Sequence, residues 1–421
     1  MSNLLPVDWN LKNLEDVCTW VGVGIATSTT HAYTDSGTPL LRNQNILPNS
    51  IRDSDMLYIT KDFARENESK KLRKGDVVTI RTGYPGVSAV IPSRYDGCQT
   101  FTTLISRPNP LKVDPNYLAV LINSDYGRAF VLGGQAGGAQ QNLNVSVLKQ
   151  FPVILPPLPE QKKIATILTS VDEVIEKTQA QIDKLKDLKT GMMQELLSRG
   201  VGVDGKPHTE LKDSPVGKIP KGWEVVKFKD IFHTYKYGPR FSSKDYDELG
   251  NVKTIRGTDL SSDGVIKYSQ VPVARLDNKL VTQNALNHGD LVMITTADCG
   301  ATAVFESQSI PYIASAYAIK LTPKTGLNSK YINYFMQTDD ALSQVDSFVR
   351  KGTVANLPGS DVMSMILALP PFDEQNQVVR ILEKLDENIT LKLKVLDSKQ
   401  SLKKALMQDL LTGKVRVKVD S

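Results

Sequence analysis

The sequence lacks the features that would place it in or across a membrane. It contains no run of 18 or more apolar residues, and its start, MSNLLPVDWN, has neither the charged nor the apolar region of a signal peptide. Cysteine is also scarce, and Cys18, Cys98 and Cys299 lie far apart without metal-ligand spacing. We therefore expect a soluble, cytoplasmic protein with free thiols, no metal site and no membrane partner.

A strong charge excess is missing as well. The chain has 51 Lys and Arg residues against 46 Asp and Glu residues, and its net charge of +5 is modest for a protein that binds nucleic acid. Any such surface is therefore local or is shared with a partner. A length of 421 residues with 40% apolar side chains is sufficient for two domains, each with its own core.

An internal repeat organises the chain. A shift of 214 residues places Trp9 on Trp223 and keeps one register as far as Val201 on Val415. Each copy has the same order: a mixed globular segment, here called the head, then a Pro-Pro boundary, then a long helix with polar and apolar faces. The chain is therefore two copies of one structural unit.

Each head is predicted to be mixed, with more strand than helix. The dipeptides Gly75-Asp76 and Gly289-Asp290 each precede a β-branched run, which is typical of a turn that leads into a strand. A further strand is expected over residues 100–106 and 312–321, followed by a short amphipathic helix around Tyr117 and Tyr331. Late loops at 133–142 and 349–356 then complete the heads.

Each head ends at a proline boundary that predicts the start of a long helix. Pro157 is followed by Glu160 and Pro371 by Glu374, so a proline and an acid stand where a helix N-terminus favours both. The apolar residues that follow recur at spacings of three, four and seven, which predicts a coiled-coil seam about 57 Å long. The predicted seam and partner-docking positions are Ile164, Ile167, Leu168, Val171, Ile175, Ile182, Leu185, Val378, Leu382, Leu385, Ile389 and Leu396. The same stripe includes Val174, Leu188, Leu393 and Leu402, and Gly200 and Gly413 are expected to end the helices.

An apolar stripe of that length needs a partner, and the other helix of the chain is the simplest one. The repeat alone leaves parallel and antiparallel pairing open. We favour antiparallel pairing, because parallel pairing requires the linker after Val201 to run back along the whole helix. Antiparallel pairing predicts an approximate two-fold axis and a head at each end, an arrangement suited to two half-sites on duplex DNA.

In this combination the chain resembles, over its whole length, the specificity subunits of type I restriction-modification systems. The resemblance depends on the order head, helix, head, helix, on the boundary Pro156-Pro-Leu-Pro-Glu-Gln161, on the Gly-Asp strand starts, and on the helix end Met-Gln-Glu-Leu-Leu197, repeated as Met-Gln-Asp-Leu-Leu411. Asp373 replaces Pro159 and Lys399 replaces Leu185 in the second copy, so the docking contacts of the two helices are expected to differ.

The resemblance implies an α+β fold with two target-recognition domains and an antiparallel coiled coil. The expected boundaries are 1–157 for the first domain, 158–200 for the first helix, 201–219 for a linker, 220–371 for the second domain, 372–413 for the second helix and 414–421 for a tail. It also implies a non-catalytic subunit that binds double-stranded DNA, two DNA methyltransferase subunits and restriction or translocase subunits. S-adenosylmethionine and ATP are then expected on those partners, with no cofactor on this chain.

Local patterns that suggest catalysis are incomplete. Leu369-Pro-Pro-Phe372 resembles the tetrapeptide of amino-methyltransferases, but Leu369 cannot hydrogen-bond a target amine. The glycine-rich loop lacks the GK[ST] ending of a P-loop, and Glu210-Leu-Lys212 has an acid-x-lysine spacing that arises by chance in a linker. No metal-ligand pair occurs among His31, His208, His233 and His288. We expect no catalytic residues.

Candidates for DNA contact are basic, amide and aromatic side chains on the loops of the heads. Arg42 and Arg256 occupy equivalent positions after a β-like run and suit bidentate contact with guanine or phosphate, with a structural salt bridge as the alternative. The densest basic cluster of the first head suits phosphate contact, with a solvated turn as the alternative. This cluster consists of Lys70, Lys71, Arg73 and Lys74.

Other candidates lie where the two heads differ. Arg81 and Tyr84 correspond to Thr295 and Asp298, although the flanking residues agree. Positions that differ on a shared frame are where two heads would read different sequences. The equivalent late loops contribute Gln140, Gln141, Arg350 and Lys351.

We therefore expect a DNA-recognition subunit in which each head reads one half of a bipartite target and the coiled coil sets the gap. One alternative is a self-contained DNA methyltransferase or nuclease, which the lack of an S-adenosylmethionine or metal motif disfavours. The other is a coiled-coil scaffold that binds only proteins, which leaves two elaborate heads unexplained.

Overall fold

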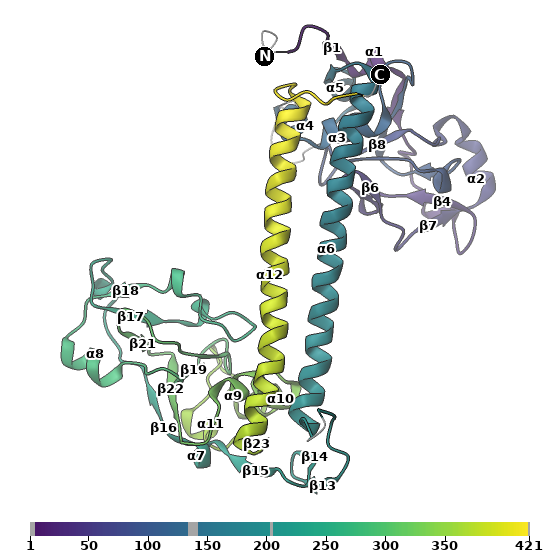
Figure 1. Cartoon of the computed structure of the whole chain (residues 1–421). Coiled ribbons are helices and arrows are strands. Elements are labelled where there is room, and N and C mark those ends of the chain that lie inside the picture. The colour runs from purple at the N-terminus through teal and green to yellow at the C-terminus, as the bar shows by residue number, and fades with distance from the viewer. Residues whose placement is uncertain (1–4, 134–141, 203–204, 420–421) are drawn as a thin grey trace. The chain divides into compact units, whose positions relative to one another are not determined.

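The computed structural model describes residues 5–133, 142–202 and 205–419, and the chain forms two compact units. Unit 1 comprises residues 1–180 and 393–421, and unit 2 comprises residues 181–392. Each unit therefore combines one head with a part of each long helix (Figure 1).

The head of unit 1 is built around two four-stranded sheets. The antiparallel sheet has the order β2 (Cys18–Val23), β11 (Thr103–Pro108), β8 (Val77–Ile80) and β9 (Ser88–Val90). The second sheet has the order β10 (Gln99–Thr100), β4 (Thr38–Leu41), β7 (Leu57–Ile59) and β3 (Tyr33–Thr34), with β10 parallel to β4. Two short pairs join β1 (Asn10–Asn13) to β12 (Pro152–Leu155) and β5 (Ile46–Leu47) to β6 (Ser50–Ile51).

Among its described residues this head also contains the α-helices α1 (Leu14–Val17), α2 (Lys61–Glu66), α3 (Pro115–Asn123), α4 (Asp125–Gly133) and α5 (Val145–Lys149). The short helix predicted around Tyr117 is α3, and it lies in the core, where Tyr117 and Leu121 are fully buried. Asp114 caps it by accepting hydrogen bonds from the Asn116 and Tyr117 amides.

The head of unit 2 repeats this plan. Its four-stranded sheet has the order β16 (Phe232–Tyr237), β22 (Ala318–Pro323), β19 (Leu291–Ile294) and β20 (Thr302–Val304). Its second described sheet has the strand order β18 (Val273–Ala274), β17 (Val252–Ile255) and β21 (Tyr312–Ala314). Two short antiparallel pairs are also present: β15 (Glu224–Lys227) with β23 (Ile366–Leu369), and β13 (Leu211–Ser214) with β14 (Gly217–Pro220). The helices are α7 (Phe228–Ile231), α8 (Asn278–Asn284), α9 (Ser329–Phe335), α10 (Asp339–Phe348) and α11 (Gly359–Val362). The predicted mixed α/β character of both heads is confirmed.

The Gly-Asp strand starts are confirmed, but the predicted strands over 100–106 and 312–321 are wrong. Each is two short strands in different sheets: β10 and β11 in unit 1, and β21 and β22 in unit 2. Thr102 adopts a φ of 55° between β10 and β11, and a turn closed by the Ala318 amide on the Ser315 carbonyl precedes β22. An apolar pattern does not reveal such a change of sheet, because both halves are buried.

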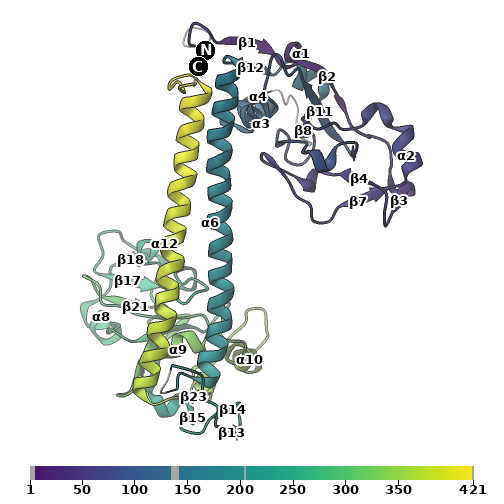
Figure 2. The ribbon, with the colours of Figure 1, turned by 45° about the vertical axis from the view of Figure 1, so that its right-hand side comes forward.

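Two long helices follow the heads, α6 (Leu158–Arg199) and α12 (Phe372–Leu411). In unit 1, Ile164 near the start of α6 belongs to the same core cluster as Leu410 at the end of α12. In unit 2, Leu196 near the end of α6 packs in one cluster with Val378 near the start of α12. The two helices are therefore antiparallel, as predicted, and lie side by side in both views (Figures 1 and 2).

The predicted apolar stripe is correct at most positions and wrong at four. Ile164, Leu168, Ile182, Val378, Leu382, Ile389 and Leu396 are buried, and Ile167, Val171, Ile175, Leu185 and Leu385 are partly buried. Val174, Leu188, Leu393 and Leu402 are exposed instead. Thr178 and Lys189 are buried on α6, because the inward positions follow the heptad spacing and not the side-chain polarity.

Both predicted helix stops are glycines with the left-handed backbone that favours glycine. Gly200 has a φ of 64° and Gly413 a φ of 73°. A side chain at Gly200 would meet Glu374 and the Trp223 ring, and one at Gly413 would meet Pro6. Each helix end is therefore packed tightly against the head of its own unit.

Burial raises the pKa of both Cys18 and Cys98 to about 12, so these thiols stay protonated. Within the described ranges no helix is long and apolar enough to cross a membrane. The same residues contain no group of three or more His, Cys, Asp or Glu side chains that could hold a metal ion.

Candidate nucleic-acid interface

In unit 1, one edge of the head brings together candidates that are far apart in sequence. Arg42 and Asn43 follow β4, whereas Arg81 and Thr82 follow β8. The Asn43 side-chain amide donates to the Thr82 carbonyl and lies within hydrogen-bond distance of its hydroxyl, both at 3.1 Å. We name the surface formed by Arg42, Asn43, Arg81, Thr82 and Tyr84 the unit 1 edge.

Some polar side-chain atoms at the unit 1 edge lack a hydrogen-bond partner within the described part of the chain. Among the described residues, the Arg42 Nε, the Asn43 Oδ1 and the Arg81 Nε are buried without a hydrogen-bond partner. Burying such atoms unpaired costs free energy, so this edge is a less stable part of the head. The Tyr84 side chain beside them is 80% exposed and offers a stacking surface.

In unit 2, the corresponding edge follows β17 and β19. The Ala297 amide donates to the Ala355 carbonyl at 3.0 Å, which joins the loop after β19 to the predicted late loop. That late loop carries Arg350 and Lys351, both exposed, with an Arg350 Nη2 3.7 Å from Asp361. We name the surface formed by Arg256, Ala297, Tyr317, Arg350 and Lys351 the unit 2 edge.

One equivalent pair of residues gives the two edges different charge. The Arg42 amide donates to the side chain of Asn45, and the Arg256 amide donates to the side chain of Asp259, which is the equivalent position. The Arg256 guanidinium also binds both oxygens of buried Asp259, at 3.1 and 3.0 Å, which raises the pKa of Arg256. The Arg42 guanidinium instead donates to the Asp55 carbonyl. Arg256 therefore forms the salt bridge considered as an alternative, whereas no carboxylate among the described residues pairs with Arg42.

Thr295 occupies a buried position. Its side chain is 1% exposed and its hydroxyl donates to the Tyr317 carbonyl at 3.1 Å. The exposed group at this place is the Tyr317 ring, with 63% of the residue accessible. Sequence reasoning did not single out Asn43, which follows β4, or Tyr317, which lies in the turn between β21 and β22 that the apolar pattern did not reveal.

The basic cluster of the first head lies apart from the unit 1 edge. Lys70, Lys71, Arg73 and Lys74 precede β8, whereas Arg81 follows it. Lys71 pairs with Glu68 at 3.0 Å, while Arg73 and Lys74 are exposed. The cluster therefore suits a separate contact with a phosphate backbone. Gln140 and Gln141 lie outside the described residues.

A second arrangement that sequence reasoning missed joins each head to a helix end. In unit 1, buried Glu160 accepts from the Trp9 indole at 3.2 Å and from Arg416, which also binds Asp8. In unit 2, Glu374 is within hydrogen-bond distance of the Trp223 indole at 3.0 Å, the Val201 amide at 2.9 Å and His208 Nε2 at 2.9 Å. The signal was available, since Trp9 and Glu160 recur 214 residues later as Trp223 and Glu374.

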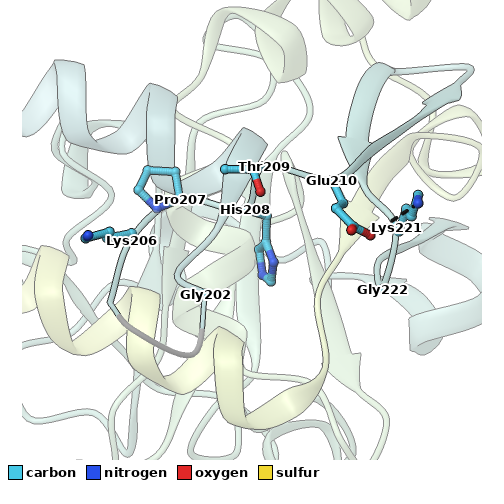
Figure 3. Close-up of a pocket in the computed structure, with 8 residues that line it drawn as sticks. All are labelled: Gly202, Lys206, Pro207, His208, Thr209, Glu210, Lys221 and Gly222. Atoms are coloured by element: carbon cyan, nitrogen blue, oxygen red, sulfur yellow. Dashed lines mark hydrogen bonds and ion pairs between the residues drawn. The ribbon is translucent and has the colours of Figure 1, made fainter.

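The linker of unit 2 surrounds a shallow hollow beside this cluster (Figure 3). Its lining includes His208, Glu210 and Lys221, and the last two form an ion pair at 3.2 Å. The side chain of Lys212 donates to the Lys221 carbonyl. Glu210 and Lys212 therefore have structural partners, which agrees with the interpretation of this triplet as a linker feature.

The chain matches the family model of the type I restriction modification DNA specificity domain twice, over residues 6–187 and 220–398. These segments make up most of the chain, so the protein belongs to this family. The match confirms the family that the sequence resemblance indicated.

Named relatives and solved structures agree with this assignment. The putative type I restriction enzyme MjaX specificity subunit of Methanocaldococcus jannaschii is 26% identical, over 98% of this chain and 95% of the relative. The type I restriction enzyme EcoKI specificity subunit of Escherichia coli K12 is 23% identical, over 90% and 82%. The crystal structure of a type I restriction-modification system S subunit from M. genitalium has a TM-score of 0.59 at 14% identity, covering 97% of this chain and 96% of that one. The structural likeness supports the fold.

Proposed function

We propose that this chain is the non-catalytic, sequence-specific DNA-recognition subunit of a type I restriction-modification complex. Each head reads one half of a bipartite target, the first domain (1–157) through the unit 1 edge and the second (220–371) through the unit 2 edge. The helices α6 and α12 set the gap between the half-sites.

The observation that carries this proposal is that the two heads share one backbone plan, whereas the unit 1 edge and the unit 2 edge carry different side chains. Arg42 and Arg256 stand at equivalent positions after β4 and β17, yet within the described part of the chain a carboxylate pairs with Arg256 and none pairs with Arg42. Tyr84 is prominent on one edge and Tyr317 on the other. Two domains of the same fold that recognise different DNA sequences need different base-contacting side chains at equivalent positions.

The candidates divide by the contact that each side chain suits. Arg42, Arg81 and Arg350 suit base edges, because a guanidinium forms bidentate hydrogen bonds in the major groove. Arg73, Lys74 and Lys351 are exposed and suit phosphates. Thr295 acts by holding the Tyr317 backbone.

The helices also dock two DNA methyltransferase subunits, and restriction or translocase subunits join that assembly. Exposed apolar side chains on α6 and α12 support this docking, namely Val174, Leu188, Leu393 and Leu402. S-adenosylmethionine and ATP bind to those partners and not to this chain.

Coexpression with the cognate methyltransferase subunit, followed by mapping of modified adenines across a genome, tests the proposal. We expect a two-part motif with an unspecified gap, and a contiguous palindrome would contradict it. The purified chain alone, incubated with DNA and labelled S-adenosylmethionine, is expected to transfer no methyl group. Transfer without a partner would support the alternative of a self-contained methyltransferase.

Replacing Arg81 with alanine is expected to weaken discrimination at one base of one half-site. The loss of a bidentate base contact corresponds to about 10- to 100-fold. The other half-site and the gap stay unchanged, because they depend on the other head and the helices. Lys74→Ala is the matched control at the opposite end of β8, and it weakens binding equally for all sequences. The assignment of Arg81 fails if both variants behave alike in methylation of a randomised target library.

A further inference from the structure

Lysines interrupt the apolar seam between α6 and α12. The inward positions recur every three or four residues, and they include Thr178 and Lys189 on α6 and Lys392, Lys399 and Lys403 on α12. Lys189 is only 8% exposed. A buried ammonium group is unfavourable unless a carboxylate compensates it, so each buried lysine needs a defined partner.

In unit 2, Lys189 finds that partner on the opposite helix. Its ammonium nitrogen lies 2.6 Å from Asp386 Oδ1 on α12 and 5.4 Å from the centre of the Tyr334 ring. The Tyr334 hydroxyl, from α9 of the head, donates to Asp386 Oδ2 at 2.8 Å. Asp386 therefore joins three elements: the opposite helix, its own helix and its own head.

Unit 1 contains the same arrangement with the helices exchanged. Lys403 of α12 forms an ion pair with Asp172 Oδ1 of α6. Asp172 Oδ2 accepts from the Asn49 side chain of the head at 3.2 Å. The Asn49 side chain in turn accepts a hydrogen bond from the Asn123 side chain at 2.7 Å. The Asn123 side chain also accepts from the Ser88 amide and donates to the Ser88 carbonyl. The link therefore continues into α3 and the sheet.

The two arrangements are equivalent by the internal repeat. Lys189 and Lys403 are 214 residues apart, and so are Asp172 and Asp386. Each head supplies a different side chain to this aspartate. Tyr334 donates to Asp386 Oδ2 in unit 2, and Asn49 donates to Asp172 Oδ2 in unit 1. The ion pair is therefore common to both copies of the repeat, whereas the side chain that links it to the head differs between the two copies.

Stability alone does not explain these ion pairs. Apolar residues of similar size at a buried ion pair are often neutral or stabilising, whereas a single polar position in a seam selects one register. Sliding one helix by a heptad moves it about 10 Å, which separates both lysines from both aspartates at once. Any shifted register therefore leaves four charges without their partners.

We propose that Lys189–Asp386 and Lys403–Asp172 are positioning residues that fix the register of α6 against α12 and connect each head to that register. This inference rests on the proposed function, because the register then determines which gap between half-sites the complex accepts. None of these four residues is among the candidates for DNA contact.

A neutral variant tests the proposal without leaving a charge unpaired. It combines Lys189→Met with Asp386→Asn and Lys403→Met with Asp172→Asn, so that Tyr334 and Asn49 keep an acceptor. With the methyltransferase partner and a target library of varied gaps, we expect both half-sites to be unchanged. Methylation at gaps about three base pairs from the preferred one is expected to rise about 10-fold relative to that preferred gap, because registers shifted by a heptad, about 10 Å, become accessible.

Two further variants separate positioning from general weakening. The exchanged variant, Lys189→Asp with Asp386→Lys and Lys403→Asp with Asp172→Lys, is expected to restore gap selectivity. The control, Glu173→Gln with Lys177→Met, removes an exposed ion pair within α6 and is expected to change nothing. Unchanged gap selectivity in the neutral variant would overturn the proposal.

A second readout does not depend on DNA. In the free chain, amide hydrogen exchange of α6 around Lys189 is expected to be about 10-fold faster in the neutral variant than in the wild type. If the wild-type complex methylates no two-part site, the proposed function fails, and the exchange rates still decide the role of the ion pairs. Equal exchange rates in both proteins would overturn that role.

Discussion

Glu374→Ala is expected to lower the free energy of unfolding of unit 2 by about 3 kcal/mol. The carboxylate is the shared acceptor for the Trp223 indole, the Val201 amide and His208. Trp223 is 1% exposed, so its indole N–H loses a buried acceptor when the carboxylate is removed. Denaturant unfolding measures the change when it is followed by amide hydrogen exchange of the strands and helices of unit 2, which reports on that unit separately from unit 1.

Glu374→Gln is the matched control. Glutamine keeps a carbonyl acceptor for Trp223 or Val201, so it is expected to lose less than half as much stability as alanine. Glu160→Ala is the counterpart in unit 1 and is expected to lower the stability of that unit instead. A Glu374→Ala effect below about 1 kcal/mol would mean that the cluster does not hold the helix end to the head.

These clusters show what the repeat could and could not predict. Trp9 and Glu160 recur as Trp223 and Glu374 in the sequence, so their equivalence was visible. Their contact was not, because each pair is separated by 151 residues and neither side chain belongs to a local motif. A repeated polar residue at the boundary of a predicted helix indicates a tertiary contact, although it does not name the partner.

The long helices were predictable because their signals are local. Proline at the start, glycine at the end and heptad spacing are all read within one segment, and α6 and α12 match them. Polarity at individual positions was misleading, because Lys189 is buried against Tyr334 while Leu188 beside it is exposed. Lysine tolerates an inward position by packing its aliphatic stem and pairing its terminal charge.

The candidate edges were predictable only in part. Equivalent arginines were recognised, but Asn45 and Asp259, which decide whether each arginine is neutralised, were not. Their effect depends on the turn after β4 and β17, which brings the side chain of Asn45 or Asp259 into contact with the arginine three residues earlier. That contact depends on the folded backbone and cannot be inferred from residue type alone.

Removing one heptad from both helices is expected to shorten the accepted gap by about 3 base pairs. Seven helical residues span about 10 Å, and stacked bases are spaced about 3.4 Å apart. Deleting residues 175–181 and 389–395 together keeps the heptad pattern and spares the Lys189–Asp386 and Lys403–Asp172 ion pairs. Adenine mapping with the methyltransferase partner measures the gap, and the bases of both half-sites are expected to stay the same.

The single deletions are the controls for this experiment. Removing residues 175–181 alone shortens α6 by one heptad while α12 keeps its length, so at least one ion pair is separated and the protein is expected to unfold at lower denaturant concentration. The paired deletion is expected to retain more stability than either single one, because the register is kept. Altered half-sites with an unchanged gap in the paired deletion would show that the helices do not set the spacing, and the gap would then have to be determined by the partner subunits.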